Sequence, residues 1–248
     1  MTSNLRQKEI LRLMEEHGSV SVRDLTRQLY VSEATVRRDL SELERIGALK
    51  RTFGGATPIL DTKQQIPLFI RESMDAQRKN ALCKQAAELV RDGDTIFIDG
   101  SSTLQALAKY LSPRKDIIAI TYSIKTAELL CQNHIKTYCS GGMLIENSLV
   151  CTGPKAIDFA KNINVDICFL SCKGVDRDGT FTDTSEEETS VRRAFLENAK
   201  TRVCLMTENK IGKRYLHTLC RAEEIDVLLS DGELPPSLRA RLRKDDKI

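Results

Sequence analysis

Apolar residues recur at helical spacing in three successive segments of the first fifty residues. Gly18 closes the first segment, because glycine readily adopts the left-handed conformation found just after a helix. Ser21 and Asp24 suit a capping box at the start of the second, and Ser32 is a favoured N-cap for the third, which ends at Gly47. The side chains predicted to face inward are Ile10, Leu13, Met14 and His17 in the first segment, Val22, Leu25 and Leu29 in the second, and Val36, Leu40 and Leu43 in the third. The pattern predicts three short helices.

The third predicted helix turns small and basic residues away from its apolar stripe. At 100° per residue, Arg38 lies about 200° from Val36. Small side chains let a helix enter the major groove of DNA, where arginine suits phosphate oxygens or the O6 and N7 edge of guanine. A short helix, a tight turn and this longer helix therefore predict a helix-turn-helix. The alternative is a solvated face on which Arg37 and Arg38 pair with Asp39, Glu42 or Glu44.

A basic segment follows the third helix. Residues 49–53 suit a strand, and Gly54 and Gly55 suit a turn after it. A hairpin here would bring Lys50 and Arg51 to a neighbouring DNA backbone, as a wing does.

Six short apolar runs alternate with amphipathic segments in the larger part of the chain. Helices are expected near residues 76–91 and from about Thr103, Lys125, Lys155 and Ser185. The apolar runs between and after them are residues 95–99, 116–121, 135–140, 165–171, 201–206 and 225–230. Nearly continuous apolar runs between helices are typical of parallel strands covered on both faces, so the pattern predicts an α/β domain.

Glycines, hydroxyls and charged residues follow several of these predicted strands. Ligands of such sheets bind beyond the carboxyl ends of the strands. Residues 99–103, DGSST, combine a glycine with three hydroxyls at a predicted helix start, which suits a phosphate. The loop is neither a Walker A loop nor G-x-G-x-x-G. The alternatives are an ordinary capped helix start and, for the other strand ends, ordinary turns.

Composition narrows the function classes. The 248 residues carry 38 basic and 35 acidic side chains, a net charge of +3, so any nucleic-acid signal must be local. Eight scattered cysteines and three histidines include no C-x-x-C pair, which favours buried, reduced thiols over a metal site. No leader-like start or long apolar run occurs, so we expect a cytoplasmic protein without a membrane partner, and no cofactor is predicted.

The stretch VSEATVRRDLSELERIGALKRTFGGA closely resembles the N-terminal signature of the DeoR family of bacterial transcription regulators. The matching positions are Ser32, Thr35, Val36, Arg37, Arg38, Asp39, Leu40, Leu43, Glu44, Gly47, Leu49, Arg51, Gly54, Gly55 and Ala56. Many family members have histidine or tyrosine in place of Phe53. The resemblance implies a winged helix-turn-helix over residues 1–56. The expected DNA-contacting residues are Ser32, Glu33, Ala34, Thr35, Arg37, Arg38, Ser41, Lys50, Arg51, Gly54 and Gly55.

The rest of the chain resembles the DeoR-type sensor domain, whose fold is similar to ribose-5-phosphate isomerase and glucosamine-6-phosphate deaminase. The resemblance implies a linker over residues 57–75, a sensor domain over 76–234 and a tail over 235–248. The expected effector-binding residues are Asp99, Gly100, Ser101, Ser102, Thr103, Thr121, Tyr122, Ser123, Gly141, Gly142, Lys173, Gly174, Asp176, Glu188 and Lys210. The chain departs from the family pattern at Tyr122, where asparagine is common, and at residues 207–209 before Lys210.

The resemblance implies a sequence-specific transcriptional regulator, a repressor of carbohydrate-metabolism genes controlled by a phosphorylated sugar. Its expected partners are an operator in double-stranded DNA, the effector and further copies of the chain, as a dimer or tetramer. One alternative is a sugar-phosphate isomerase or deaminase with a DNA-binding appendage, using residues such as Asp99, Asp176, Glu188 and Lys210. Another is a winged helix that binds protein.

Overall fold

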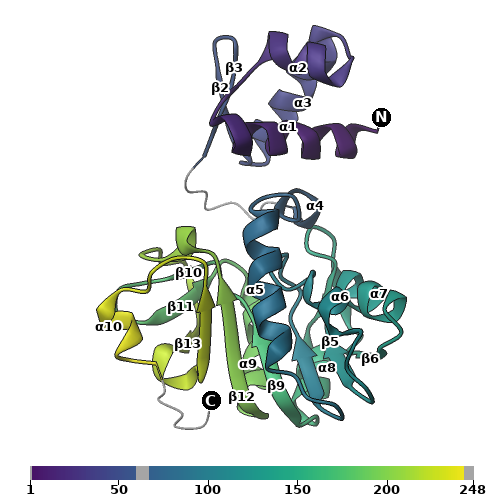
Figure 1. Cartoon of the computed structure of the whole chain (residues 1–248), viewed down its shortest axis with the longest axis vertical. Helices are drawn as coiled ribbons and strands as arrows, with labels where there is room; N and C mark the ends of the chain where they lie inside the picture. Colours follow the sequence, from purple (N-terminus) through teal and green to yellow (C-terminus); the bar gives the residue numbers. More distant parts are fainter. Residues whose placement is uncertain (1, 60–66, 243–248) are drawn as a thin grey trace. The chain divides into compact units, whose positions relative to one another are not determined.

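The computed structural model describes residues 2–59 and 67–242, which fall into two compact units, Met1–Ala76 and Gln77–Ile248 (Figure 1). Each unit has its own buried core.

The first unit contains the three predicted helices. Its elements are α1 (Ser3–His17), β1 (Val20–Ser21), α2 (Val22–Leu29), α3 (Glu33–Arg45), β2 (Leu49–Thr52), β3 (Gly55–Pro58) and α4 (Leu68–Arg71). Gly18 ends α1 at a φ of 72°. The hydroxyls of Ser21 and Ser32 accept hydrogen bonds from the backbone N–H groups of Asp24 (3.0 Å) and Thr35 (3.3 Å). The predicted caps are therefore confirmed.

The predicted core of the first unit is confirmed except at His17. The apolar residues predicted to face inward are buried, whereas the His17 side chain is exposed. His17 is the last residue of α1, where a polar ring stays in water, and Leu11 adds to the buried face instead.

The hairpin of β2 and β3 is extended by β1, giving an antiparallel sheet in the order β1-β3-β2. Gly55 is required here, because a Cβ atom at this position would lie 1.9 Å from the Val20 carbonyl oxygen. Gly55 therefore lets β3 approach β1, whereas Gly54 lies in open space at the hairpin turn.

The stretch predicted as a linker is partly structured. β3 continues to Pro58, and α4 lies within residues 57–75. Ile70 of α4 is buried in the core of the first unit, and Lys8 of α1 forms an ion pair with Glu72 at 2.8 Å. The apolar cluster in this stretch thus packs on α1; residues 60–66 lie outside the described residues.

The second unit is built on a six-stranded parallel sheet, and all six predicted strands are confirmed. The strands are β4 (Thr95–Ile98), β5 (Ile118–Thr121), β6 (Lys136–Cys139), β9 (Val165–Leu170), β12 (Ala199–Met206) and β14 (Val227–Ser230). Their order is β14-β12-β9-β4-β5-β6. The order reverses between β4 and β9, and such a reversal is where ligands of open α/β sheets bind.

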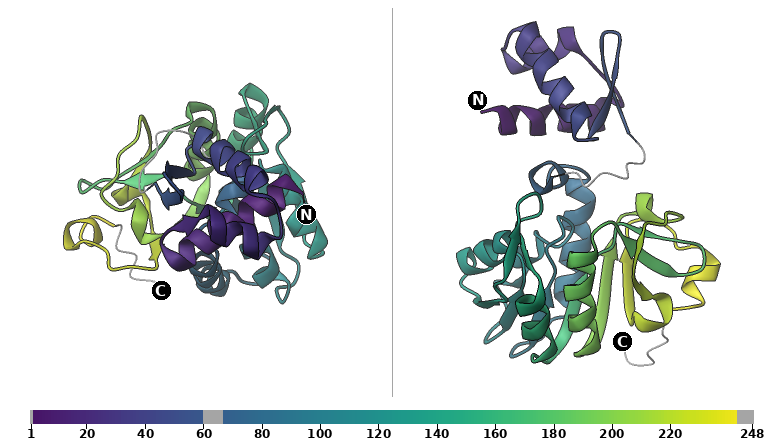
Figure 2. Two further views of the ribbon diagram at one scale, coloured as in Figure 1. Left: turned by 90° about the horizontal axis from the view of Figure 1, so that it is seen from above. Right: turned by 180° about the vertical axis from the view of Figure 1, so that it is seen from behind.

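Helices cover both faces of this sheet (Figure 2). They are α5 (Ala76–Glu88), α6 (Leu107–Leu111), α7 (Ile124–Gln132), α8 (Pro154–Lys161) and α9 (Glu186–Glu197). Side chains of α5, α6 and α7 share one apolar core with the sheet, and those of α8 and α9 share another. The predicted α/β class is therefore confirmed.

Several short elements of the second unit were not predicted. They are the hairpin β7 (Met143–Ile145) and β8 (Val150–Thr152), the small antiparallel sheet β10 (Gly174–Val175), β11 (Thr180–Asp183) and β13 (His217–Arg221), the 3₁₀ turns Glu208–Lys210 and Ala222–Glu224, and α10 (Pro236–Arg239). In the predicted tail, Leu238 of α10 packs into the core; residues 243–248 lie outside the described residues. The helix expected from Thr103 begins only at Leu107, after a series of turns.

The prediction that the cysteines are buried is wrong at two positions. Six of the eight are buried, but Cys131 and Cys139 are exposed. They lie on α7 and on the edge strand β6, where apolar packing is incomplete. Within residues 2–59 and 67–242, no cluster of metal-ligating side chains and no helix with the length and apolarity of a membrane span occurs.

Candidate nucleic-acid and effector sites

Helix α3 presents a polar face opposite its buried stripe. Ser32, Glu33, Ala34, Arg37, Arg38 and Ser41 are exposed, and Thr35 is half-buried. Arg37 pairs with Glu33 at 3.4 Å. Arg38 makes no hydrogen bond or ion pair with another described residue, so its guanidinium group is available to a ligand.

The wing is tied to α3 through Arg51. Its backbone N–H donates to the Glu44 carboxylate (2.9 Å), and its guanidinium donates to the Ser41 hydroxyl (2.8 Å). Lys50 and Phe53 remain exposed. The wing and the polar face of α3 thus form one surface.

Asp39, one of the acidic partners that the solvated-face alternative offers to Arg37 and Arg38, pairs with neither of them. Its side chain is buried and accepts hydrogen bonds from Arg6 (Nη2 to Oδ1, 3.0 Å) and Ser3 (3.2 Å). Hydrogen bonding to Asp39 raises the pKa of Arg6. The helical angle of Asp39, about 300° from Val36, places it beside the edge of the apolar stripe and could have revealed this role.

The second candidate site lies where the strand order reverses. Asp99 follows β4, and Ser171 follows β9. The buried Asp99 carboxylate accepts from the Ser101 N–H through Oδ1 and from the Ser171 N–H through Oδ2, both at 2.8 Å. One carboxylate therefore fixes two adjacent strand-end loops.

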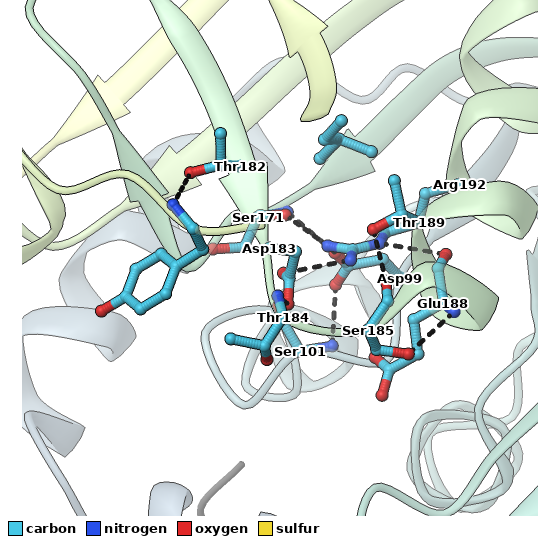
Figure 3. Close-up of polar contacts among 12 residues, drawn as sticks. Asp99, Ser101, Ser171, Thr182, Asp183, Thr184, Ser185, Glu188, Thr189 and Arg192 are labelled. Atoms are coloured by element: carbon cyan, nitrogen blue, oxygen red, sulfur yellow. Dashed lines mark hydrogen bonds and ion pairs between the residues drawn. The ribbon is translucent and has the colours of Figure 1, made fainter. Parts of the chain in front are cut away.

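Arg192 of α9 is buried beneath these loops (Figure 3). Its Nη1 donates to the Ser171 carbonyl at 2.9 Å, and its Nη2 lies 3.0 Å from an Asp183 oxygen; Asp99 is 4.0 Å away. Burial raises the pKa of Asp183, but the positive charge of Arg192 acts together with hydrogen bonds from the Thr184 N–H and from Arg192, and the net pKa is lowered. Ser171, Asp183 and Arg192 were not predicted as site residues, because the contacts that unite them join distant segments.

Two lysines reach the DGSST loop. Lys79 Nζ donates to the Ser102 hydroxyl (3.2 Å), and Lys210 Nζ contacts the hydroxyls of Thr103 (3.3 Å) and Ser171 (2.9 Å). The buried Ser101 hydroxyl has no hydrogen-bond partner among the described residues. A polar, partly cationic loop with an unpaired hydroxyl is suited to an anion.

The neighbouring strand end contributes predicted residues with different roles. Thr121 and Ser123 are buried; the Thr121 hydroxyl accepts from the Ser123 N–H (3.1 Å), and Ser123 caps α7. Gly100 is required because a Cβ there would lie 2.4 Å from Val150. Tyr122, only 1 % exposed, stacks on Phe97, with ring centroids 6.0 Å apart; its ring belongs to the core.

The remaining predicted residues lie on loops or at element ends. Gly141 and Gly142 connect β6 to β7, Glu188 is in the first turn of α9, and the Lys173 ammonium lies over the Tyr215 ring. Gly174 begins β10. Asp176 accepts from the N–H groups of Asp178 and Thr180 at 2.9 Å, so its carboxylate shapes the turn between β10 and β11.

Comparisons with known proteins match the two parts of the chain to two domains of one family. Residues 6–62 match the DeoR-like helix-turn-helix domain, and residues 74–232 match the DeoR C terminal sensor domain. Among solved structures, the chain is similar to ribose 5-phosphate isomerase A from Methanocaldococcus jannaschii, with 20 % identity, 55 % of each chain covered and a TM-score of 0.43.

Several curated proteins are similar to this chain over nearly their whole length, and they are transcriptional regulators. GolR from Listeria innocua is 33 % identical over 94 % of this chain and 92 % of that protein. The repressor GlcR from Bacillus subtilis is 33 % identical over 90 % and 86 %, and the repressor AccR from Agrobacterium fabrum is 31 % identical over 91 % and 88 %. These relatives favour a regulator over an enzyme. The chain belongs to the DeoR family of transcriptional regulators, with a helix-turn-helix domain and a sensor domain.

Proposed function

We propose that the chain binds an operator through α3 and the wing and represses carbohydrate-metabolism genes until a phosphorylated sugar binds its sensor domain. The observation that carries the effector assignment is the contact of Lys210 with Thr103 and Ser171 beside the unpaired Ser101 hydroxyl. Repression is supported by the relatives GlcR and AccR, which are named repressors.

The DGSST loop offers several groups that suit a phosphate. Hydroxyls and ammonium groups donate hydrogen bonds to phosphate oxygens. Within the described residues, the backbone N–H groups of Gly100, Ser102 and Thr103 make no hydrogen bond. Of these, the N–H groups of Ser102 and Thr103 are successive, and successive backbone N–H groups can form an anion-binding concavity. The carboxylates of Asp183 and Glu188 are the candidates for accepting sugar hydroxyl hydrogens.

Control of DNA binding requires the effector to favour one arrangement of the protein over another. A homo-oligomer provides such arrangements, because two recognition helices must match two half-sites. We therefore propose that the protein acts as a homo-oligomer in the cytoplasm and that the effector changes its fit to the operator.

A thermal-shift screen of the full chain tests the effector class. Sugar phosphates are compared with the same sugars without phosphate and with inorganic phosphate, since a ligand of the native state raises the melting temperature by mass action. We expect at least one sugar phosphate to raise it, and Lys210→Met to weaken that rise. Lys84→Met, an exposed lysine of α5, is the matched control. No rise with any sugar phosphate, or the same rise in Lys210→Met, would refute the site.

The regulatory half of the proposal is tested with the sugar phosphate found in the screen. In a gel-shift titration on genomic fragments, it should lower operator affinity of the parent protein. Operator affinity that is the same with and without this ligand would contradict control by the sensor domain.

A further inference from the structure

Large apolar side chains are exposed at one edge of the sensor domain. The β6 edge patch consists of Ile124, Tyr138, Met143, Leu144 and Leu149, which are 38–59 % exposed. They are five of the six exposed large apolar side chains in the described part of this unit; the sixth is Leu216. Single exposed apolar residues are ordinary on a protein surface, whereas a cluster marks an interaction site.

Hydrogen bonds connect the neighbouring segments that carry the patch residues. The Ile124 N–H donates to the Leu149 carbonyl (2.9 Å), and Leu144 of β7 pairs with Cys151 of β8. The Ser140 N–H, directly after β6, donates to the Thr121 carbonyl (3.0 Å). Burial and the neighbouring Cys139 thiol raise the pKa of Cys151, in agreement with β8 lying beside the end of β6.

The patch also includes an open sheet edge. Within the described residues, β6 pairs only with β5 and is the last strand of the parallel sheet (Figure 1). Its outer backbone groups can accept another strand. Two copies of β6 related by a two-fold axis would run antiparallel, so the edge is complementary to itself.

The charges around the patch also suit a second copy. Lys125 pairs with Glu128 at 2.7 Å, and the exposed Lys136 and Glu146 carry opposite charges. A rim with both signs can face its own copy without net repulsion, whereas a rim of one sign would repel it.

The area is sufficient for a modest interface. About half of five large side chains amounts to roughly 400–500 Å² of apolar surface, at the size where a patch on a monomer is often functional. A symmetric pair doubles this area, and the β6 backbone and polar rim bring it near the lower limit of about 1,200 Å² for a stable interface.

We propose that the β6 edge patch is a two-fold interface between two copies of this chain, formed by antiparallel β6 strands and the apolar side chains beside them. The proposal rests on the proposed function, which requires a homo-oligomer, and it locates the contact. The interface adjoins the predicted effector residues Ser123, Gly141 and Gly142, because the same β7–β8 hairpin borders both. Effector binding can therefore reach the partner through the hairpin.

Sedimentation of full-length variants tests the interface. We expect Leu144→Lys to halve the mass of the assembly at a concentration where the parent is fully associated. Leu216→Lys, which alters an exposed residue outside the patch, should sediment like the parent. Equal masses for the two variants would overturn the proposal, provided that both melt cooperatively.

Crosslinking of protein that keeps Leu144 tests the same contact even if Leu144→Lys does not fold. Cys131 and Cys139 are the exposed cysteines of the described chain. The reagent is a bismaleimide with a spacer of about 10 Å, which is the length of about three residues of a strand. In a Cys131→Ser protein, it should join Cys139 to Cys139 of a second copy and double the mass. The control Cys131→Ser/Cys139→Ser should remain uncrosslinked. Absence of the covalent dimer in the first protein would count against β6 pairing.

Failure of this interface and failure of the proposed function give different results. If only the interface is wrong, sugar phosphates still raise the melting temperature and the operator still binds, but Leu144→Lys keeps its full mass. If only the proposed function is wrong, Leu144→Lys halves the mass although no sugar phosphate changes melting or operator binding.

Discussion

At the scale of single residues, the arginines and aspartates of this chain divide into external and internal groups. Arg38 faces solvent and makes no hydrogen bond or ion pair with another described residue, whereas Asp39, the next residue, is buried against Arg6. Arg192 is buried among carboxylates, whereas Arg193 is exposed. Adjacent charged residues in one motif can therefore serve recognition and stability separately.

Arg38→Ala should reduce discrimination between operator and unrelated DNA while leaving the fold intact. Loss of one base-edge contact is worth about 1–3 kcal/mol. The measurement is a gel-shift titration on operator and scrambled DNA. Arg45→Ala is the control, since Arg45 lies near the end of α3 and pairs with Glu42 at 2.6 Å. Unchanged discrimination in Arg38→Ala would show that this side chain does not read the operator.

Arg192→Met should destabilise the protein strongly at neutral pH, by about 3–5 kcal/mol, because buried carboxylates lose their cation. In the parent, the pKa of Asp183 is lower in the folded than in the unfolded protein, where it is about 3.9. Asp183 therefore stabilises the fold at pH values above 3.9, and this stabilisation is lost as the pH falls through the folded pKa. In the variant, burial raises the pKa of Asp183 and Arg192 no longer lowers it. Protonation of Asp183 at lower pH then removes the cost of burying its charge.

The difference in unfolding free energy between parent and Arg192→Met should consequently shrink as pH falls from 8 toward 5. Urea denaturation across this range measures it. Arg193→Met removes hydrogen bonds to the carbonyls of Thr218 and Leu219 and should show a smaller deficit without this pH trend. A constant deficit for Arg192→Met would indicate that the carboxylates remain compensated.

At the scale of elements, periodicity determined how much could be predicted. The six strands of the large sheet and the helices α1 to α3 were predictable because burial imposes a repeating pattern on each. The strands β7, β8 and β10 have only two or three residues, too few to show a period, and β11 and β13 pair antiparallel outside the alternation of parallel strands with helices. Strand order was also outside the reach of local pattern, so the approach of Ser171 and Arg192 to Asp99 could not be foreseen. Because ligands of such sheets bind beyond the carboxyl ends of the strands, Asp99 and Lys210 were nevertheless predicted at the same edge of the sheet.

Leu40→Ala tests the face assignment of α3. Leu40 is 0 % exposed, and removing a buried leucine side chain costs about 2–5 kcal/mol. We expect the thermal transition of the first unit to fall clearly. Leu5→Ala, a half-exposed leucine of α1, should melt like the parent. Similar melting of both variants would contradict the packing of α3.

At the scale of the whole molecule, the weak local charge of the first unit favours the proposed association for tight DNA binding. Residues 1–56 contain ten basic and eight acidic side chains, so one helix-turn-helix gains little from general attraction to phosphates. Two linked copies gain affinity because the second binding event is effectively intramolecular.

The spacing of operator half-sites should therefore matter. Inserting about 5 bp, half a turn of DNA, between half-sites should lower affinity at least about tenfold, and inserting about 10 bp should restore much of it. Gel-shift titrations on the three DNA lengths measure the effect. Equal affinity on all three would mean that the two helix-turn-helix domains do not bind as a fixed pair.

The two hydrogen bonds accepted by Asp99 make the loops after β4 and β9 mechanically interdependent. A ligand that pulls the Ser101 amide away from one carboxylate oxygen also perturbs the bond to the Ser171 amide, and Ser171 in turn contacts Arg192 of α9. Ligand binding on one loop should thus change amide hydrogen exchange at Ser101 and Ser171 together, and Asp99→Asn should uncouple the two rates. Equal exchange rates at both amides with and without ligand would show that Asp99 does not couple the two loops.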